Sequence, residues 1–126
     1  MKVERFYDAL GDILYLDFPK SRKINMGIEI ADDIILRVDP DTLIPTKLVI
    51  HNYTKIVAEN LEGRTDFEIT LSAIPAKYRV AVLRALRSAP LNEFLELRGS
   101  AKRPRLALTS ALLPQTESPR GIAQVA

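Results

Sequence analysis

The sequence contains no cysteine, no tryptophan and a single histidine among its 126 residues. The absence of cysteine excludes disulfides, thiolate metal sites and any Cys–His catalytic pair, and it suits a reducing cytosol. With one histidine, His51, a two-histidine metal site could form only across an oligomer. His51 falls at the end of a predicted strand, so we interpret it as a structural or surface residue rather than a general base.

Glycine is also scarce, and the five glycines of the chain are isolated from one another. A P-loop or a dinucleotide-binding fingerprint needs clustered glycines that let the backbone approach a phosphate, and neither pattern occurs. No Gly-x-Ser-x-Gly motif is present that would expose a serine nucleophile. The sequence therefore predicts a protein that is not an enzyme, with no catalytic residue, no cofactor and no metal ligand.

Long apolar runs are missing as well. No stretch approaches the ~18 consecutive apolar residues that a membrane helix needs. The first residues, MKVERFYDAL, are charged from position 2 onwards and lack the apolar segment of a signal peptide. We therefore expect a soluble, cytoplasmic protein that does not contact a membrane.

What the chain does contain is the composition of one folded domain. Hydrophobic residues make up 47% of the sequence and charged residues 27%, which is close to the average for globular proteins. A chain of this length buries about two-thirds of its unfolded surface on folding. Extensive disorder is therefore not expected.

The first half of the sequence is rich in predicted strands. Alternating or continuous apolar runs are separated by turn-forming Asp, Gly and Pro residues. Residues 53–61 then place apolar side chains at i, i+3, i+4 and i+8, which predicts a short helix that Asn52 or Thr54 could cap. The predicted strands of this half are 2–7, 13–18, 27–31, 34–38 and 45–51.

The second half combines helix and strand. Residues 65–71 alternate and predict a half-buried strand, and Pro75 to Ser88 carries one apolar stripe that predicts the longest helix. Residues 94–98 and 105–109 are further predicted strands. The fold class is therefore α+β, with an antiparallel β-sheet of about five to six strands, one long helix and one short helix.

The domain organisation follows from the same patterns. Residues 1–63 form a β-rich half, and residues 64–113 form a strand–helix–strand extension that packs on it. Residues 114–126 are rich in Pro, Gln, Ser and Gly, which cannot bury enough surface to order themselves, so we expect a disordered tail.

Aspartates crowd the predicted turns of the first half. Paired carboxylates could bind a hard cation or perform acid–base chemistry. Aspartate is, however, favoured in tight turns because its side chain accepts hydrogen bonds from free backbone N–H groups. We favour the turn role for these residues, which are Asp8, Asp12, Asp32, Asp33, Asp39 and Asp41.

The first half also resembles a known family. Lys2-Val3, then Tyr7-Asp8 and Gly11-Asp12-Ile13-Leu14-Tyr15-Leu16, are followed by Asp33-Ile34-Ile35-Leu36-Arg37-Val38-Asp39, the turn Pro40-Asp41-Thr42 and the run Lys47-Leu48-Val49-Ile50-His51-Asn52-Tyr53. This order is similar to that of short bacterial proteins catalogued as a domain of unknown function (number twenty-two eighty-three). The resemblance covers residues 1–57. The sequence departs from the family around Pro45-Thr46, where a glycine is common, and in its longer C-terminal extension.

The resemblance implies a small antiparallel β-rich unit. Some relatives are encoded beside small toxin-like proteins, so the resemblance also implies antitoxin-type partner binding as one role. No catalytic residues are established for the family, and none is carried over.

Basic residues gather in the second half. No acidic residue occurs between Ala73 and Ser88, and helical geometry places three cations of this segment opposite its apolar stripe. Such a patch could neutralise phosphates or contact an acidic partner, although a solvated helix face with a flexible basic loop is the interpretation we favour. The candidate contact residues are Lys77, Arg84 and Arg87 in the helix, and Lys102, Arg103 and Arg105 in the segment that follows it.

Apolar residues outside the main helical stripe favour a binding role. Val80 and Leu83 leave part of the predicted helix apolar nearly all round, so it needs cover on two sides. The edges of a small open sheet can also add a partner strand. We therefore expect a non-catalytic protein-interaction module, antitoxin-like, that binds itself as a homo-oligomer and an unidentified protein. The alternative is a nucleic-acid-binding protein that uses helix 75–88 and loop 98–105.

Overall fold

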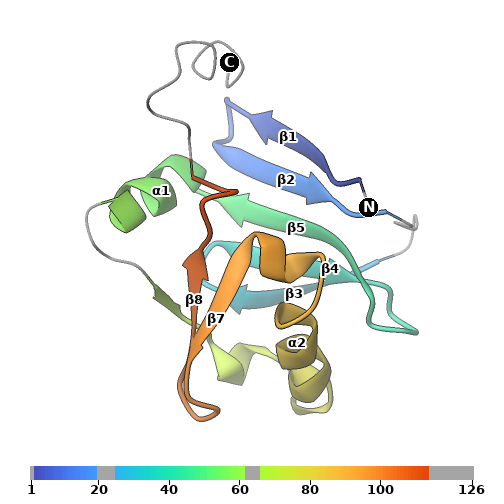
Figure 1. Cartoon of the computed structure of the whole chain (residues 1–126). Helices are drawn as coiled ribbons and strands as arrows, with labels where there is room; N and C mark the ends of the chain where they lie inside the picture. Colours follow the sequence, from blue (N-terminus) through green and yellow to red (C-terminus); the bar gives the residue numbers. More distant parts are fainter. Residues whose placement is uncertain (1, 20–24, 62–65, 114–126) are drawn as a thin grey trace.

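The computed structural model describes residues 2–19, 25–61 and 66–113 of the chain. In this part of the protein, two antiparallel sheets and two α-helices surround one core (Figure 1). The α+β fold class predicted from the sequence is confirmed. The predicted disordered tail, residues 114–126, lies outside the described residues.

The main sheet has five strands in the order β1-β2-β5-β4-β3, and every neighbouring pair is antiparallel. β5 is central because it returns between the two hairpins β1–β2 and β3–β4. The strand bounds are Glu4–Asp8 for β1, Ile13–Asp17 for β2, Met26–Ala31 for β3, Ile34–Val38 for β4 and Pro45–His51 for β5.

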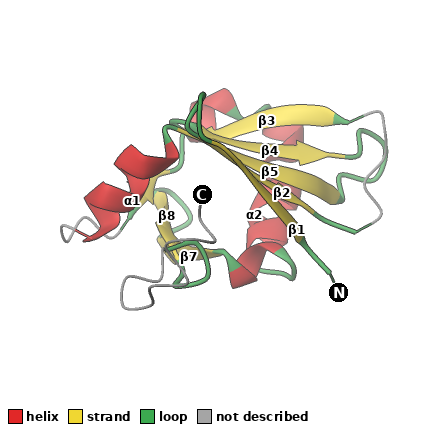
Figure 2. Cartoon of the chain, turned by 90° about the horizontal axis from the view of Figure 1, so that it is seen from above, coloured by secondary structure: helices red, strands yellow, loops and turns green. Residues whose placement is uncertain are grey.

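The second sheet has three strands in the order β6-β8-β7. Its strands are β6 (Phe67–Glu68), β7 (Leu95–Gly99) and β8 (Pro104–Leu108). The helices are α1 (Tyr53–Leu61) and α2 (Arg79–Leu86), and three short 3-10 turns span Leu71–Ala73, Ala76–Tyr78 and Leu91–Glu93. Seen from above, α1 and the second sheet lie to one side of the twisted main sheet (Figure 2).

The core lies between the inner face of the main sheet and the second half of the chain. Burial alternates along β2 and β4, so Leu14 and Leu16 are buried while the residue between them is not. Each fully buried Leu or Ile contributes about 1.5–3 kcal/mol relative to an exposed one. The core draws side chains from both halves, and the rings of Phe18 and Phe94 stack across it with centroids 6.4 Å apart.

Two predicted elements are shorter in the structure. The helix predicted from Pro75 to Ser88 becomes a 3-10 turn followed by α2, because Pro75 has an extended backbone with ψ of 136°. The predicted strand 65–71 pairs only at Phe67–Glu68, because the chain enters a 3-10 turn at Leu71. None of the helices in the described ranges is both long and apolar enough to cross a membrane.

Candidate interaction surface

One side of α2 presents a stripe of exposed side chains. Val80 and Arg84 lie four positions apart on one side of α2, Lys77 lies in the 3-10 turn before the helix, and Arg87 directly follows it. All four are exposed, and Val80 is 68% exposed although it is apolar. We call these four residues the α2 stripe. The three cations predicted from the sequence are exposed along α2 and at its two ends, and the apolar Val80 lies among them in the sequence.

The opposite side of α2 holds the helix in place. Val82 and Leu86 are buried in the core. Arg79, the first residue of α2, donates from Nε to the carbonyl oxygens of Leu71 and Ile74, at 3.0 Å each. Arg79 therefore serves the scaffold, because its guanidinium satisfies the carbonyl groups of the preceding turn.

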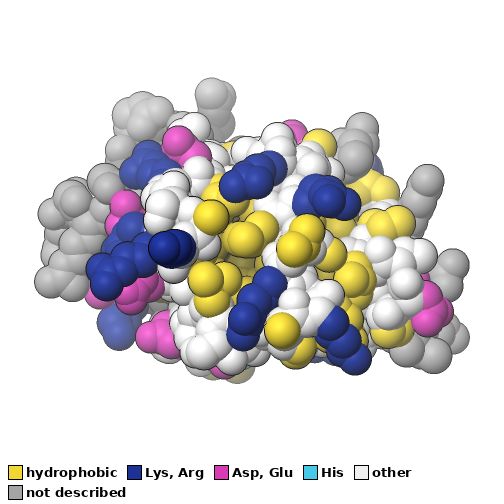
Figure 3. Space-filling view, turned by 90° about the horizontal axis from the view of Figure 1, so that it is seen from below, with side chains coloured by type: hydrophobic (Ala, Val, Ile, Leu, Met, Phe, Trp, Pro, Cys, Tyr) yellow, Lys and Arg dark blue, Asp and Glu magenta, His cyan; other side chains and the backbone are white. Residues whose placement is uncertain are grey.

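The α2 stripe is electropositive and its cations are available. No acidic residue occurs between Glu68 and Glu93. In residues 2–19, 25–61 and 66–113, the side chains of Arg84 and Arg87 form no hydrogen bond or ion pair, and Lys77 Nζ lies 5.1 Å from the ring centroid of Tyr78. Seen from below, hydrophobic side chains lie among Lys and Arg, while Asp and Glu lie toward the edges (Figure 3).

The predicted basic loop divides into two parts. Lys102 and Arg103 are exposed in the β7–β8 connection, which Figure 1 shows at the same lower end of the molecule as α2. Arg105 lies in β8, and its Nε donates to Oδ1 of Asp66 at 2.6 Å. Because this ion pair neutralises Arg105 within the chain, we remove Arg105 from the candidate contact residues.

Two of the six turn aspartates, Asp8 and Asp39, bind backbone N–H groups of their own turns, as predicted. Oδ1 of Asp8 accepts hydrogen bonds from the N–H groups of Leu10 and Gly11, at 3.1 and 3.3 Å. Oδ1 of Asp39 accepts from the two residues that follow Pro40, at 2.8 and 3.2 Å. Within the described ranges, no group of three or more Asp, Glu or His residues is placed to hold a metal ion.

Asp12 forms a network that the sequence did not predict. Its carboxylate accepts hydrogen bonds from the Tyr7 hydroxyl at 2.6 Å, from the Thr54 hydroxyl at 2.7 Å and from the Thr54 N–H at 3.2 Å. Its carbonyl oxygen accepts from the Tyr53 N–H at 3.1 Å. Asp12 therefore caps α1 from the β1–β2 turn. The predicted cap by Asn52 or Thr54 is wrong, because the Asn52 side chain donates to Asp33 instead.

The same network changes the acidity of its members. Desolvation raises the pKa of Asp12, but the hydrogen bonds from Tyr7 and Thr54 outweigh it and hold the pKa below its ordinary value. The hydrogen bond to Asp12 raises the pKa of Tyr7 above its usual range. Burial raises the pKa of Tyr53, and the charge of Arg5 opposes this shift. The hydrogen bonds of Asp12 thus join the β1–β2 hairpin to the start of α1.

His51 ends β5, as the sequence predicted. Its N–H donates to the carbonyl oxygen of Asp33 at 2.7 Å, and its side chain is half-buried.

No family model, curated protein or solved structure matches the chain. The resemblance of residues 1–57 to the unknown-function family stays a prediction.

Proposed function

We propose that this protein is a non-catalytic interaction module that binds an acidic protein partner through the α2 stripe. The observation that carries the proposal is the position of Val80, 68% exposed, on the same side of α2 as Arg84 and shortly after Lys77. An exposed apolar side chain flanked by two cations fits a partner that offers carboxylates beside an apolar residue.

Val80 also argues against nucleic acid as the partner. The affinity for a phosphate backbone increases with the number of cations in contact with it, and a central valine adds little to that affinity. Of the basic residues near this end, Arg105 is paired with Asp66 and Arg98 with Glu96, at 2.6 and 3.0 Å. The nearest aromatic residue, Tyr78, is half-buried, so it offers little surface on which a base could stack.

The role suggested by the family resemblance is compatible with this partner class. Antitoxin-type binding would bring a small toxin-like protein onto the exposed stripe, and that partner would have to carry acidic and apolar residues on its contact surface. This role stays a prediction, and so does a cytoplasmic location.

A binding experiment with two probes separates the two partner classes. The probes are a labelled peptide of alternating Glu and Leu residues and a labelled random-sequence duplex DNA, both titrated with the full chain near physiological salt. We expect the peptide to bind more tightly than the DNA. Exchanging both Arg84 and Arg87 for Glu should weaken peptide binding about tenfold or more, because it reverses the charge that faces the carboxylates.

Two further variants give the test its specificity. Val80→Thr keeps the shape of the side chain but adds a hydroxyl, so it should weaken binding of the peptide and not of the DNA. Exchanging Lys102 and Arg103 for Glu reverses the same number of charges outside the α2 stripe and should leave peptide binding unchanged. If the DNA binds more tightly and Val80→Thr has no effect, the nucleic-acid alternative replaces the proposal.

A further inference from the structure

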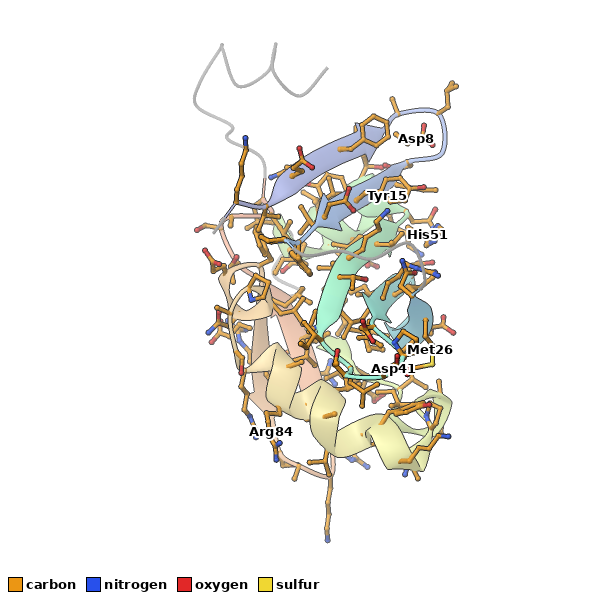
Figure 4. The ribbon with its side chains drawn as sticks, turned by 90° about the vertical axis from the view of Figure 1, so that its right-hand side faces the viewer. Asp8, Tyr15, Met26, Asp41, His51 and Arg84 are labelled. Carbon is orange, nitrogen blue, oxygen red and sulfur yellow. The ribbon has the colours of Figure 1, made fainter. Side chains whose placement is uncertain are left out.

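The outer face of the main sheet is the face directed away from the core. Figure 4 shows Tyr15 and His51 projecting on this side, away from α2 and its Arg84. Because side chains alternate along a strand, cross-strand neighbours form rows on this face. The strand register gives a middle row of Phe6, Tyr15, Val49 and Ile35, a charged row of Glu4, Asp17, Lys47 and Arg37, and a third row of Asp8, Ile13 and His51.

The middle row is an apolar strip across four strands. Phe6 is 63% exposed, and its ring stacks on that of Tyr15 with centroids 5.9 Å apart. Val49, at the centre of the row, is only 7% exposed. This strip runs across the sheet from β1 to β4 and contains no charged residue.

The charged row changes sign at the middle of the sheet. Glu4 and Asp17 lie on β1 and β2, whereas Lys47 and Arg37 lie on β5 and β4. Lys47 Nζ already lies 3.2 Å from Oδ1 of Asp17 across the boundary. The order across the sheet is therefore acid, acid, base, base.

We propose that this face binds a second copy of the chain, with a two-fold axis running along the strands between β2 and β5. That rotation places β1 of one copy over β4 of the other, and β2 over β5. In the charged row, the acids of each copy then face the bases of its partner, and the apolar strips of the two copies meet. Two sheets packed in this aligned way lie about 10 Å apart.

The charges select this arrangement over the other face-to-face dimer. A two-fold axis perpendicular to the strands would place each strand over the same strand of the partner copy. Asp8 would then face Glu4, and His51 would face Lys47, so the outer rows would repel or gain nothing. A uniformly charged partner fits the face poorly for the same reason, because it would meet both signs in one row.

The size of the face predicts a reversible dimer. The four strands that overlap in this dimer, with about five residues each, cover about 19 Å by 17 Å. This is smaller than the roughly 800 Å² that each partner buries in a standard interface. We therefore expect dissociation in the micromolar range, which is measurable by sedimentation equilibrium.

The first part of the experiment compares the full chain with two charge variants. Sedimentation equilibrium from about 1 µM to about 500 µM should show a reversible monomer–dimer equilibrium for the natural sequence. Asp17→Lys and Lys47→Asp should each weaken dimerisation about tenfold or more, because each puts two pairs of like charges into the interface.

The second part restores the charge match. An equimolar mixture of D17K and K47D should form a heterodimer, because all facing charges are again opposite. The double variant D17K/K47D should dimerise by itself like the natural sequence. The recovery of the mixture is the decisive result, because a pair that served only the fold of one chain would still carry like charges in each variant and would not be restored by mixing.

Controls fix the location of the interface. Leu10→Ser in the β1–β2 turn and Val80→Thr in α2 should leave dimerisation unchanged, and circular dichroism should show that every variant is folded. The proposal is overturned if the natural sequence stays monomeric, if D17K and K47D dimerise normally, if their mixture does not associate, or if only Val80→Thr abolishes the dimer. It stands apart from the proposed function, since acidic-partner binding at α2 can fail while the dimer persists.

Discussion

The Tyr7 hydroxyl donates to the carboxylate of Asp12 at 2.6 Å, and this carboxylate also accepts from both polar groups of Thr54. The β1–β2 turn thus supplies the cap of a helix that begins 41 residues later. We predict that Asp12→Ala lowers the free energy of unfolding by about 1–2 kcal/mol, measured by urea denaturation. Asp41→Ala, at an exposed aspartate in another turn, is the matched control, and an equal loss in both variants would contradict the capping role.

The lowered pKa of Asp12 predicts an acid-dependent contribution to stability. A carboxyl whose pKa is lower in the folded state stabilises the fold above its unfolded pKa of ~3.9, and the contribution is lost as the pH falls through the folded value. Asp12→Asn abolishes this titration. We expect the stability difference between the natural sequence and D12N to be constant near neutral pH and to shrink below about pH 4. A difference that does not change with pH would contradict the assignment.

Tyr53 joins α1 to the segment after β8. Its hydroxyl donates to the carbonyl oxygen of Leu112 and accepts from Nη2 of Arg5, the latter at 3.2 Å. Tyr53→Phe removes both bonds and leaves a buried carbonyl without its donor, so it should cost about 1–3 kcal/mol of unfolding free energy. Tyr15→Phe is the control, since the Tyr15 ring lies on the outer face. Equal effects would show that the Leu112 contact adds no stability.

Gly99 is required by the backbone of the β7–β8 hairpin. Its φ is +80°, and an added Cβ would lie 2.4 Å from the carbonyl oxygen of Arg103. Gly99→Ala should therefore destabilise the protein by about 1–3 kcal/mol, as thermal unfolding would show. At Gly27 the nearest atom is the Nη1 end of the flexible Arg37 side chain, at 3.1 Å. Gly27→Ala should cost less, and the opposite order would contradict this reasoning.

Much of the fold could be predicted from local sequence patterns. The strands Ile34–Val38 and Pro45–His51 and the helix Tyr53–Leu61 occur at the predicted positions, because apolar periodicity and turn residues agree there. The division into two sheets was not predicted. Strand order depends on which apolar faces meet. No local pattern shows that the chain, after β2 ends at Asp17, crosses the positions of β5 and β4 and forms β3 at the far edge of the sheet.

The candidate surface was predicted only in part. Helical spacing predicted exposed positions for Lys77, Arg84 and Arg87, and all three are exposed, although only Arg84 lies within α2. The same reasoning could not find the pair of Arg105 with Asp66, which are 39 residues apart. The cap by Asp12 was missed for the same reason, because the sequence offers Asn52 as a nearer cap and gives no sign of the long-range contact.

The bond from Nη1 of Arg5 to the carbonyl oxygen of Ala111, at 3.1 Å, ties the first strand to the last described segment. The two residues are 106 positions apart, so this bond closes a loop that contains nearly every other described element. β1 pairs with β2 locally, whereas its link to Ala111 forms only after the intervening strands and helices have folded. Local opening of the segment around Ala111 should therefore expose the outer edge of β1 while the β1–β2 hairpin stays paired.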